Sequence, residues 1–231
     1  MNSQKMPVIV DLPEGLLLLA TDDATGHVAT KSGALDRGLA GAVLTELLLS
    51  NRVQMEDGKV AVADASPTND PVLDDALNRI ADSRPRDAKH WIGKLASSNI
   101  RDNVLDRLTQ KGILRKEEHR ILWIIPADRY PAEDDSPEDD LRKMIRSVVL
   151  QGTTPKPRTA ILLGILKACD LLDTVFSRDE RKQFRDRIDS IAGAELMGTA
   201  VSKSVKDMQA ATMAAVTAAT TAAVIAGGSS S

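Results

Sequence analysis

Basic residues of this chain stand where they could bind a phosphate group. Two sets border predicted helices: Lys31 and Arg37 in the first, and Arg101, Arg107, Lys111, Arg115 and Lys116 in the second. Guanidinium and ammonium groups bind phosphate through charge-assisted hydrogen bonds. If the elements that carry them pack side by side, these cations converge on one anion. Otherwise they are separate surface charges on amphipathic helices.

Residue patterns typical of catalytic or metal centres do not accompany these cations. The histidines His27, His90 and His119 are scattered without the spacing of metal ligands, and Cys169 is the only cysteine. The sequence has neither a Gly-x-Ser-x-Gly elbow nor a Gly-rich phosphate loop. Carboxylate pairs that could bind a cation lie at predicted turns or helix starts: Asp22–Asp23, Asp74–Asp75 and Asp139–Asp140. We therefore expect no enzymatic activity, no metal and no cofactor.

Composition narrows the class of protein further. The chain has 231 residues, a formal charge of -3 and 42% hydrophobic residues, but only 2% aromatic residues. This length and content suffice for a core, and a core of Leu, Ile, Val and Ala favours packed helices. The charge gives no general attraction to nucleic acid. A single cysteine and the absence of a signal-peptide pattern predict a cytoplasmic protein.

Two helix-plus-hairpin units are expected to position the basic residues. A helix over residues 35–50 precedes a hairpin that turns at Asp57-Gly58, and a helix over residues 100–110 precedes a second hairpin. The units resemble a duplicated winged-helix element, although two unrelated hairpins would give the same pattern. A winged-helix-like regulator that binds nucleic acid or a protein partner is therefore the alternative function. The first helix carries Glu46 but no basic residue over residues 39–49, which disfavours DNA recognition.

The remaining segments predict a mainly α protein with a single compact helical domain. Leu16 to Leu19 read as a buried strand or a helix end, and residues 126–140 as an acidic loop after the second hairpin. Ser136 is the expected N-cap of the helix that follows. An uncharged, Ala-rich segment over residues 208–226 is expected to dock as a surface helix rather than span a membrane. Further helices are expected over residues 72–81, from residue 86, and over residues 141–150, 158–175 and 178–191.

Several stretches in order resemble the Golgi phosphoprotein 3 family, especially its actinobacterial members. The likeness runs from about residue 13 to 192 and rests on residues 16–23, 34–42, 74–77, 91–92, 107–114, 129–131 and 157–160. It implies a domain over residues 13–198, between an N-terminal arm (1–12) and an Ala-rich C-terminal extension (199–231). It also implies a non-enzymatic adaptor, peripheral on the membrane. The implied partners are a phosphatidylinositol 4-phosphate headgroup and cytosolic tails of membrane proteins, and self-association stays open.

The resemblance also implies where the headgroup binds. The family's pocket tryptophan falls on Lys31, one arginine on Ala40, and two further arginines on Ser98 and Arg101. Only Arg101 keeps the family's residue type, so the pocket is partly lost. Lys31, Arg37 and Arg101 are the headgroup-binding residues that we expect. Relatives that dock on membranes have an apolar hairpin tip, whereas the loop expected here over residues 126–140 is acidic.

Overall fold

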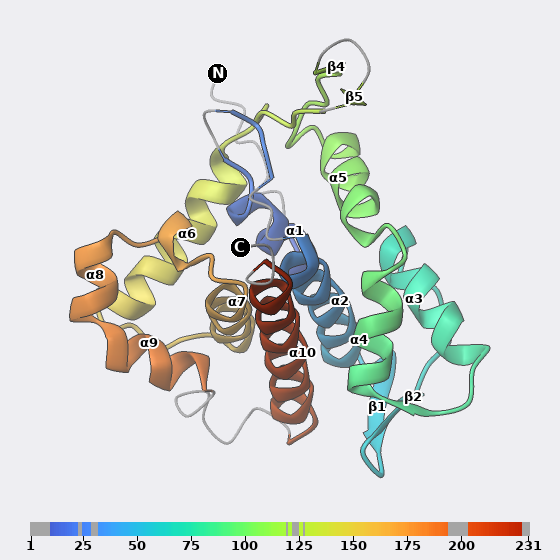
Figure 1. The fold of residues 1–231 in the computed structure, drawn as a ribbon. Coiled ribbons are helices and arrows are strands. Elements are labelled where there is room, and N and C mark those ends of the chain that lie inside the picture. Colours follow the sequence, from blue (N-terminus) through green and yellow to red (C-terminus); the bar gives the residue numbers. More distant parts are fainter. Residues whose placement is uncertain are drawn as a thin grey trace, which may run out of the picture.

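Three helices stand side by side at the centre of the molecule (Figure 1). The computed structural model describes residues 10–22, 25–28, 32–118, 120–121, 125–126, 128–193 and 203–227. The central helices are α2 (Ser32–Leu49), α7 (Pro157–Ala168) and α10 (Lys203–Gly227). Aliphatic residues such as Leu39, Leu166 and Met208 are buried between them. The predicted class, mainly α with short hairpins, is confirmed.

The leucine run forms a buried helix, α1 (Leu12–Leu19), which settles the open choice between a strand and a helix end. Asp11 is its N-cap and accepts a hydrogen bond from the Glu14 backbone N–H, while the Glu14 carboxylate accepts one from the Asp11 N–H. This capping box starts the helix. α1 is buried all round because α2, α7, α5 (Ile100–Gln110) and α6 (Ser136–Leu150) pack against it.

The first helix-plus-hairpin unit is present. β1 (Val53–Glu56) pairs antiparallel with β2 (Lys59–Val62), and the turn between them has positive φ at Asp57 and Gly58, as predicted for a type I′ turn. A third strand, β3 (Arg86–Asp87), adds to β2. The helix expected from residue 86 therefore starts later, as α4 (Ala88–Ala96), because Asp87 caps it by accepting from the His90 N–H.

The second unit has its helix where the sequence predicts it, at α5, and a short hairpin follows it. β4 (Arg120–Ile121) pairs with β5 (Ile125–Pro126), so residues 122–124 join the strands. The acidic segment 126–140 follows this hairpin, as expected, and its last part forms the start of α6, so it is not the hairpin tip that is apolar in membrane-docking relatives. The connecting residues read Leu-Trp-Ile in the sequence and lie outside the described residues.

Chain breaks that the apolar pattern does not reveal divide two of the predicted helices. The segment expected as one helix over residues 158–175 ends with α7 at Ala168, because Asp170 takes a left-handed φ of 60° before a 3-10 turn, η1 (Leu172–Thr174). The charged segment divides at Phe184 into α8 (Arg178–Gln183) and α9 (Arg185–Ala192). Ser177 caps α8 through a capping box.

Other helix starts are read correctly or nearly so. α3 (Pro71–Ala81) begins at the predicted proline, and the Asp70 side chain caps it. α6 begins at Ser136 itself, with Asp135 as N-cap, so the prediction that Ser136 is the cap was wrong by one residue. The Ser136 hydroxyl instead donates to Asp134 in the preceding turn.

The Ala-rich segment docks as a helix, as predicted, but it starts earlier, at Lys203, and is one of the central helices rather than a surface helix. α10 packs against α2, α4 and α7, and buries Met208 and Val216. Within the described part of the chain, no helix combines the length and the apolar character that crossing a bilayer requires. The boundary predicted between residues 198 and 199 stays a prediction.

Candidate functional site

An ion pair between Arg101 and Asp36 joins the start of α5 to the start of α2. Nη2 of Arg101 donates to Oδ1 of Asp36 at 2.8 Å, and Nε donates to the same oxygen at 3.1 Å. The Arg101 and Asp36 side chains remain 19% and 28% exposed. Ion pairs that keep this much contact with water are weak. The guanidinium is therefore held at the surface, where a ligand can reach it.

Arg37 lies next to Asp36 in the first turns of α2. Its Nη1 donates to the carbonyl oxygen of Gly33 at 3.0 Å, so the side chain turns back toward the start of its own helix. Arg37 and Arg101 thus belong to the same region, at the N-terminal end of α2. Lys31 directly precedes α2 in the sequence but lies outside the described residues. Its part in the site stays a prediction.

The N-terminus of α5 adds uncapped backbone donors beside Arg101. Asn99 is the N-cap residue, has a left-handed φ of 55° and makes no capping hydrogen bond through its side chain. The first N–H groups of a helix have no partner within the helix, and the helix dipole favours an anion there. Arg101 is the second residue of α5, so it belongs to the same first turn as these N–H groups.

Two positions that the resemblance assigns to the pocket contribute little here. Ala40 is fully buried within α2, and it offers no surface to a ligand. The Ser98 hydroxyl donates to the Leu95 carbonyl oxygen at 2.7 Å, which closes the end of α4. Neither position therefore supplies a charge to the expected headgroup site.

A second charged cluster, which we call the α1 hub, is buried at the start of α1. It consists of Asp11, Glu14, Asp70, Arg107 and Lys111. Nη2 of Arg107 donates to both carboxylate oxygens of Asp11, at 2.7 and 2.8 Å, and Nη1 donates to Asp70. Nε of Arg107 lies 2.8 Å from Oε1 of Glu14, and Nζ of Lys111 lies 2.7 Å from the same oxygen.

Burial and charge shift the pKa values of the α1 hub. Burial raises the pKa of Asp11 to about 6, although the positive charge of Arg107 acts in the opposite direction. For Arg107, burial lowers the pKa, but the Asp11 charge and the hydrogen bond to Asp70 more than offset it, so the pKa is raised. Three carboxylates thus share two cations in a space largely closed to water.

The α1 hub accounts for basic residues that the sequence placed in a phosphate-binding patch. Arg107 and Lys111 are held by its carboxylates, while Arg115 pairs with Glu117 and Lys116 with Asp128. These four cations therefore do not converge with the others; Arg37 and Arg101, the latter also paired with a carboxylate, lie near the start of α2, and Lys31 lies outside the described residues. The sequence signal for the hub was the Asp11-x-x-Glu14 spacing of a capping box, which sequence reasoning missed.

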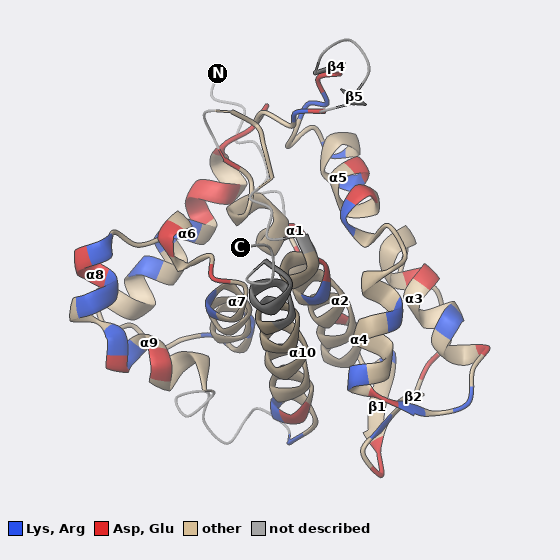
Figure 2. Cartoon of the chain, in the orientation of Figure 1, with Lys and Arg blue, Asp and Glu red and all other residues tan. Residues whose placement is uncertain are grey.

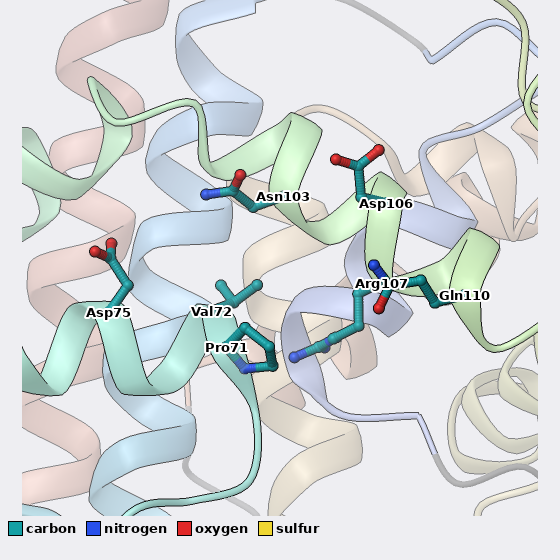
Figure 3. Close-up of a pocket in the computed structure, with 7 residues that line it drawn as sticks. All are labelled: Pro71, Val72, Asp75, Asn103, Asp106, Arg107 and Gln110. Atoms are coloured by element: carbon teal, nitrogen blue, oxygen red, sulfur yellow. The ribbon is translucent and has the colours of Figure 1, made fainter.

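A groove of about 330 Å³ lies between α3 and α5 (Figure 3). Arg107 points from α5 toward Pro71 in this view, but its guanidinium already binds the α1 hub. Asp75 pairs with Arg79 at 2.8 Å. The groove is lined by Pro71, Val72, Asp75, Asn103, Asp106, Arg107 and Gln110. None of these is a nucleophile with a neighbouring base, and the groove offers no uncommitted cation to a phosphate.

The carboxylate pairs serve local structure. Asp74 accepts from the backbone N–H and the hydroxyl of Thr68, and the Asp22 carboxylate accepts from both groups of Thr25. Asp139 and Asp140 face Lys143 one turn later in α6. Among the described residues, no group of three or more His, Cys, Asp or Glu side chains could hold a metal ion.

Comparison with known proteins gives the same family that the sequence pattern indicates. The sequence model of the Golgi phosphoprotein 3 (GPP34) family matches residues 12–208. Vacuolar protein sorting-associated protein 74 of Eremothecium gossypii is 26% identical over 162 residues, which cover 60% of this chain and 49% of that protein. The chain therefore spans about half the length of this relative.

Proposed function

Because this chain belongs to the Golgi phosphoprotein 3 family, we propose that it is a non-enzymatic adaptor that attaches peripherally to membranes by binding an anionic phospholipid headgroup. The observation that supports the proposal is the ion pair of Arg101 with Asp36, which directly precedes Arg37 near the start of α2. Lys31 precedes the same end in the sequence. The proposed site consists of Lys31, Arg37 and Arg101.

The chemistry of this region supports a phosphate ligand. Two guanidinium groups and the uncapped N–H groups of α5 are donors, and a phosphomonoester has several acceptor oxygens and close to two negative charges. Phosphatidylinositol 4-phosphate carries such a group. It is therefore the headgroup that we propose, although Ala40 and Ser98 stand where the family has arginines.

The adaptor role is supported by the relative as well as by the family. That protein is named for an association with vacuolar protein sorting. We propose that this chain also binds cytosolic tails of membrane proteins while it is attached to the headgroup. Such a role needs recognition surfaces and no bond-breaking chemistry.

The structure favours this function over the winged-helix alternative. Arg107, one of the cations of α5, is held by the carboxylates of the α1 hub and is not presented to solvent. Figure 2 shows basic and acidic residues alternating along α5, whereas a recognition helix in a DNA groove normally presents a basic face.

Sedimentation with vesicles tests the proposal. We expect the chain to bind phosphatidylcholine vesicles that contain phosphatidylinositol 4-phosphate, and not phosphatidylcholine alone. Arg101→Ala should weaken binding by about tenfold or more, because a charge-assisted hydrogen bond contributes about 1.5–3 kcal/mol. Arg37→Ala should weaken it in the same direction.

Arg79→Ala is the matched control, because Arg79 also forms an ion pair with an aspartate but lies on α3. It removes the same charge and should leave vesicle binding unchanged. Equal losses in the Arg101 and Arg79 variants would mean that only the net charge matters, and absence of binding to every anionic vesicle would refute the proposal. Circular dichroism would establish that each variant is folded.

A further inference from the structure

Asp36 occupies the edge of Arg101 that a phosphate would bind. Nε and Nη2 form one side of the guanidinium fork, and both donate to the same oxygen, Oδ1 of Asp36. The strongest guanidinium–carboxylate pairs use two parallel hydrogen bonds to two oxygens. Here Nε and Nη2 share one carboxylate oxygen, Oδ1 of Asp36.

The accessibility of this pair distinguishes it from the α1 hub. In the hub, Glu14 is 0% exposed and Arg107 is 7% exposed, so an external ligand has no access to their contact. Asp36 and Arg101 keep 28% and 19% of their side chains exposed. The hub is therefore a fixed part of the fold, whereas the Asp36–Arg101 pair can exchange its carboxylate for another anion.

We propose that Asp36 is an internal competitor at the headgroup site, which holds Arg101 until a phosphomonoester displaces it and which excludes weaker anions. This inference rests on the proposed function, because it concerns the same site. A carboxylate attached to the neighbouring helix competes at a high effective concentration. An incoming anion must therefore bind Arg101 better than a carboxylate does.

The charge of the ligand decides that competition. A phosphodiester headgroup has a single negative charge, like the Asp36 carboxylate, and gains little by replacing it. A phosphomonoester has close to two negative charges and more acceptor oxygens, so it can also use Arg37 and the N–H groups of α5. Asp36 competes with both ligands, but only the phosphomonoester binds strongly enough to displace it. Asp36 thus raises the selectivity for a phosphomonoester over a phosphodiester.

The test compares Asp36→Asn with Asp179→Asn. Both variants remove one negative charge with little change in shape, but Asp179 lies in α8, far from α5 (Figure 1). The probes are phosphatidylcholine vesicles that contain either phosphatidylserine or phosphatidylinositol 4-phosphate. We expect Asp36→Asn to raise affinity for the phosphatidylserine vesicles by about fivefold, which corresponds to the loss of a partly exposed ion pair.

The preference for the phosphoinositide should narrow in Asp36→Asn and stay at the wild-type value in Asp179→Asn. Arg101→Ala added to Asp36→Asn should abolish the gain. Equal behaviour of the two aspartate variants, an equal gain on both lipids, or a gain that survives Arg101→Ala would each overturn the inference.

The proposed function and the inference fail in different ways. If the wild-type chain binds the phosphoinositide through Arg101 but Asp36→Asn matches the control, only the inference is wrong. If neither wild type nor Asp36→Asn binds any anionic vesicle, both are wrong. A phosphomonoester could come from a free metabolite or from a lipid headgroup, and soluble glycerol phosphate distinguishes these two sources. If glycerol phosphate, at the same phosphate concentration as the lipid, releases Asp36→Asn from the vesicles, the ligand that competes with Asp36 is a free phosphomonoester. If the variant stays on the vesicles, the competing ligand is the lipid headgroup.

Discussion

The guanidinium of Arg107 is shared by carboxylates from two parts of the chain. This sharing affects the protonation of Asp11. Asp11 caps α1 and also accepts two hydrogen bonds from Arg107, while Glu14 and Asp70 draw on the same cation. Burial makes the ionised Asp11 costly, and its pKa is raised to about 6. Protonation of Asp11 would leave two carboxylates facing two cations.

Asp11 should therefore reverse the usual effect of mild acid on stability. Its pKa rises from 3.8 to about 6 on folding, so the folded chain binds the proton more tightly and the contribution of Asp11 to stability falls as pH rises through this window. The free energy of unfolding of wild type minus that of Asp11→Asn should fall by up to about 3 kcal/mol between pH 4 and pH 6. Urea denaturation at several pH values measures this difference.

Glu180 provides an internal comparison. A hydrogen bond from Arg146 lowers the pKa of Glu180 from 4.5 to about 2, so the stability that it contributes is lost only as pH falls through that lower window. For Asp11, the contradicting result would be a constant difference in the free energy of unfolding between wild type and Asp11→Asn from pH 4 to pH 6. That result would show that Asp11 has an ordinary pKa in the folded chain.

At the scale of elements, close contact between α2 and α10 places the Ala-rich helix. Gly41 faces Thr212, and a Cβ atom at Gly41 would lie 2.1 Å from Cγ2 of Thr212. Gly33 lies opposite Ala219 in the same antiparallel arrangement. Small residues let two helices approach closely, and Thr212 fills the resulting contact without exposure to solvent. The chain therefore uses the low bulk of Ala and Gly in place of large side chains.

Adding one methyl group at this contact should destabilise the fold. Gly41→Ala should cost about 1–3 kcal/mol, because the Cβ atom cannot be accommodated without displacing Thr212. Gly93→Ala in α4 is the control, since a Cβ atom there meets nothing within 4 Å, and it should stabilise by up to about 1 kcal/mol. Thermal denaturation of both variants measures the two effects, and equal stabilisation in both would contradict the packing described for α2 and α10.

At the scale of the whole molecule, α10 lies among helices that are far from it in sequence. It contacts α2 and α4 on one side and α7 on the other, and its buried residues include Val205, Met208 and Val216. The family match ends at residue 208, inside this helix. The domain boundary that we propose between residues 198 and 199 therefore assigns α10 to the extension, although α10 packs against helices of the domain.

Truncation at residue 198 should remove cooperative unfolding. Each large apolar side chain of α10 contributes about 1.5–3 kcal/mol when buried, and a domain is stable by only about 5–15 kcal/mol. We expect the truncated chain to unfold without a clear urea transition and to bind a dye that senses exposed apolar surface. A chain ending at Gly227 is the control and should unfold as the intact protein does. A wild-type transition after truncation would show that residues 199–231 are a separate extension.

Much of the fold could be predicted from local signals. The Asp57-Gly58 turn, α5 and the start of α8 at Arg178 all depend on residues close together in sequence, and each was found where it was expected. Breaks such as those at Asp170 and Phe184 were missed, because the helical pattern of residue types continues on both sides of each and neither position carries a glycine or proline that would mark a break.

The sequence by itself determined the helical class, the family and the presence of basic residues near two helix starts. Only the tertiary structure decided which of those cations remain accessible. Arg101 and Arg107 lie on the same helix and look alike in sequence, yet one faces water beside Asp36 and the other is enclosed by the carboxylates of α1 and α3. The physical reason is that charge pairing depends on distances between residues that are remote in the chain, and these are set by how the helices pack.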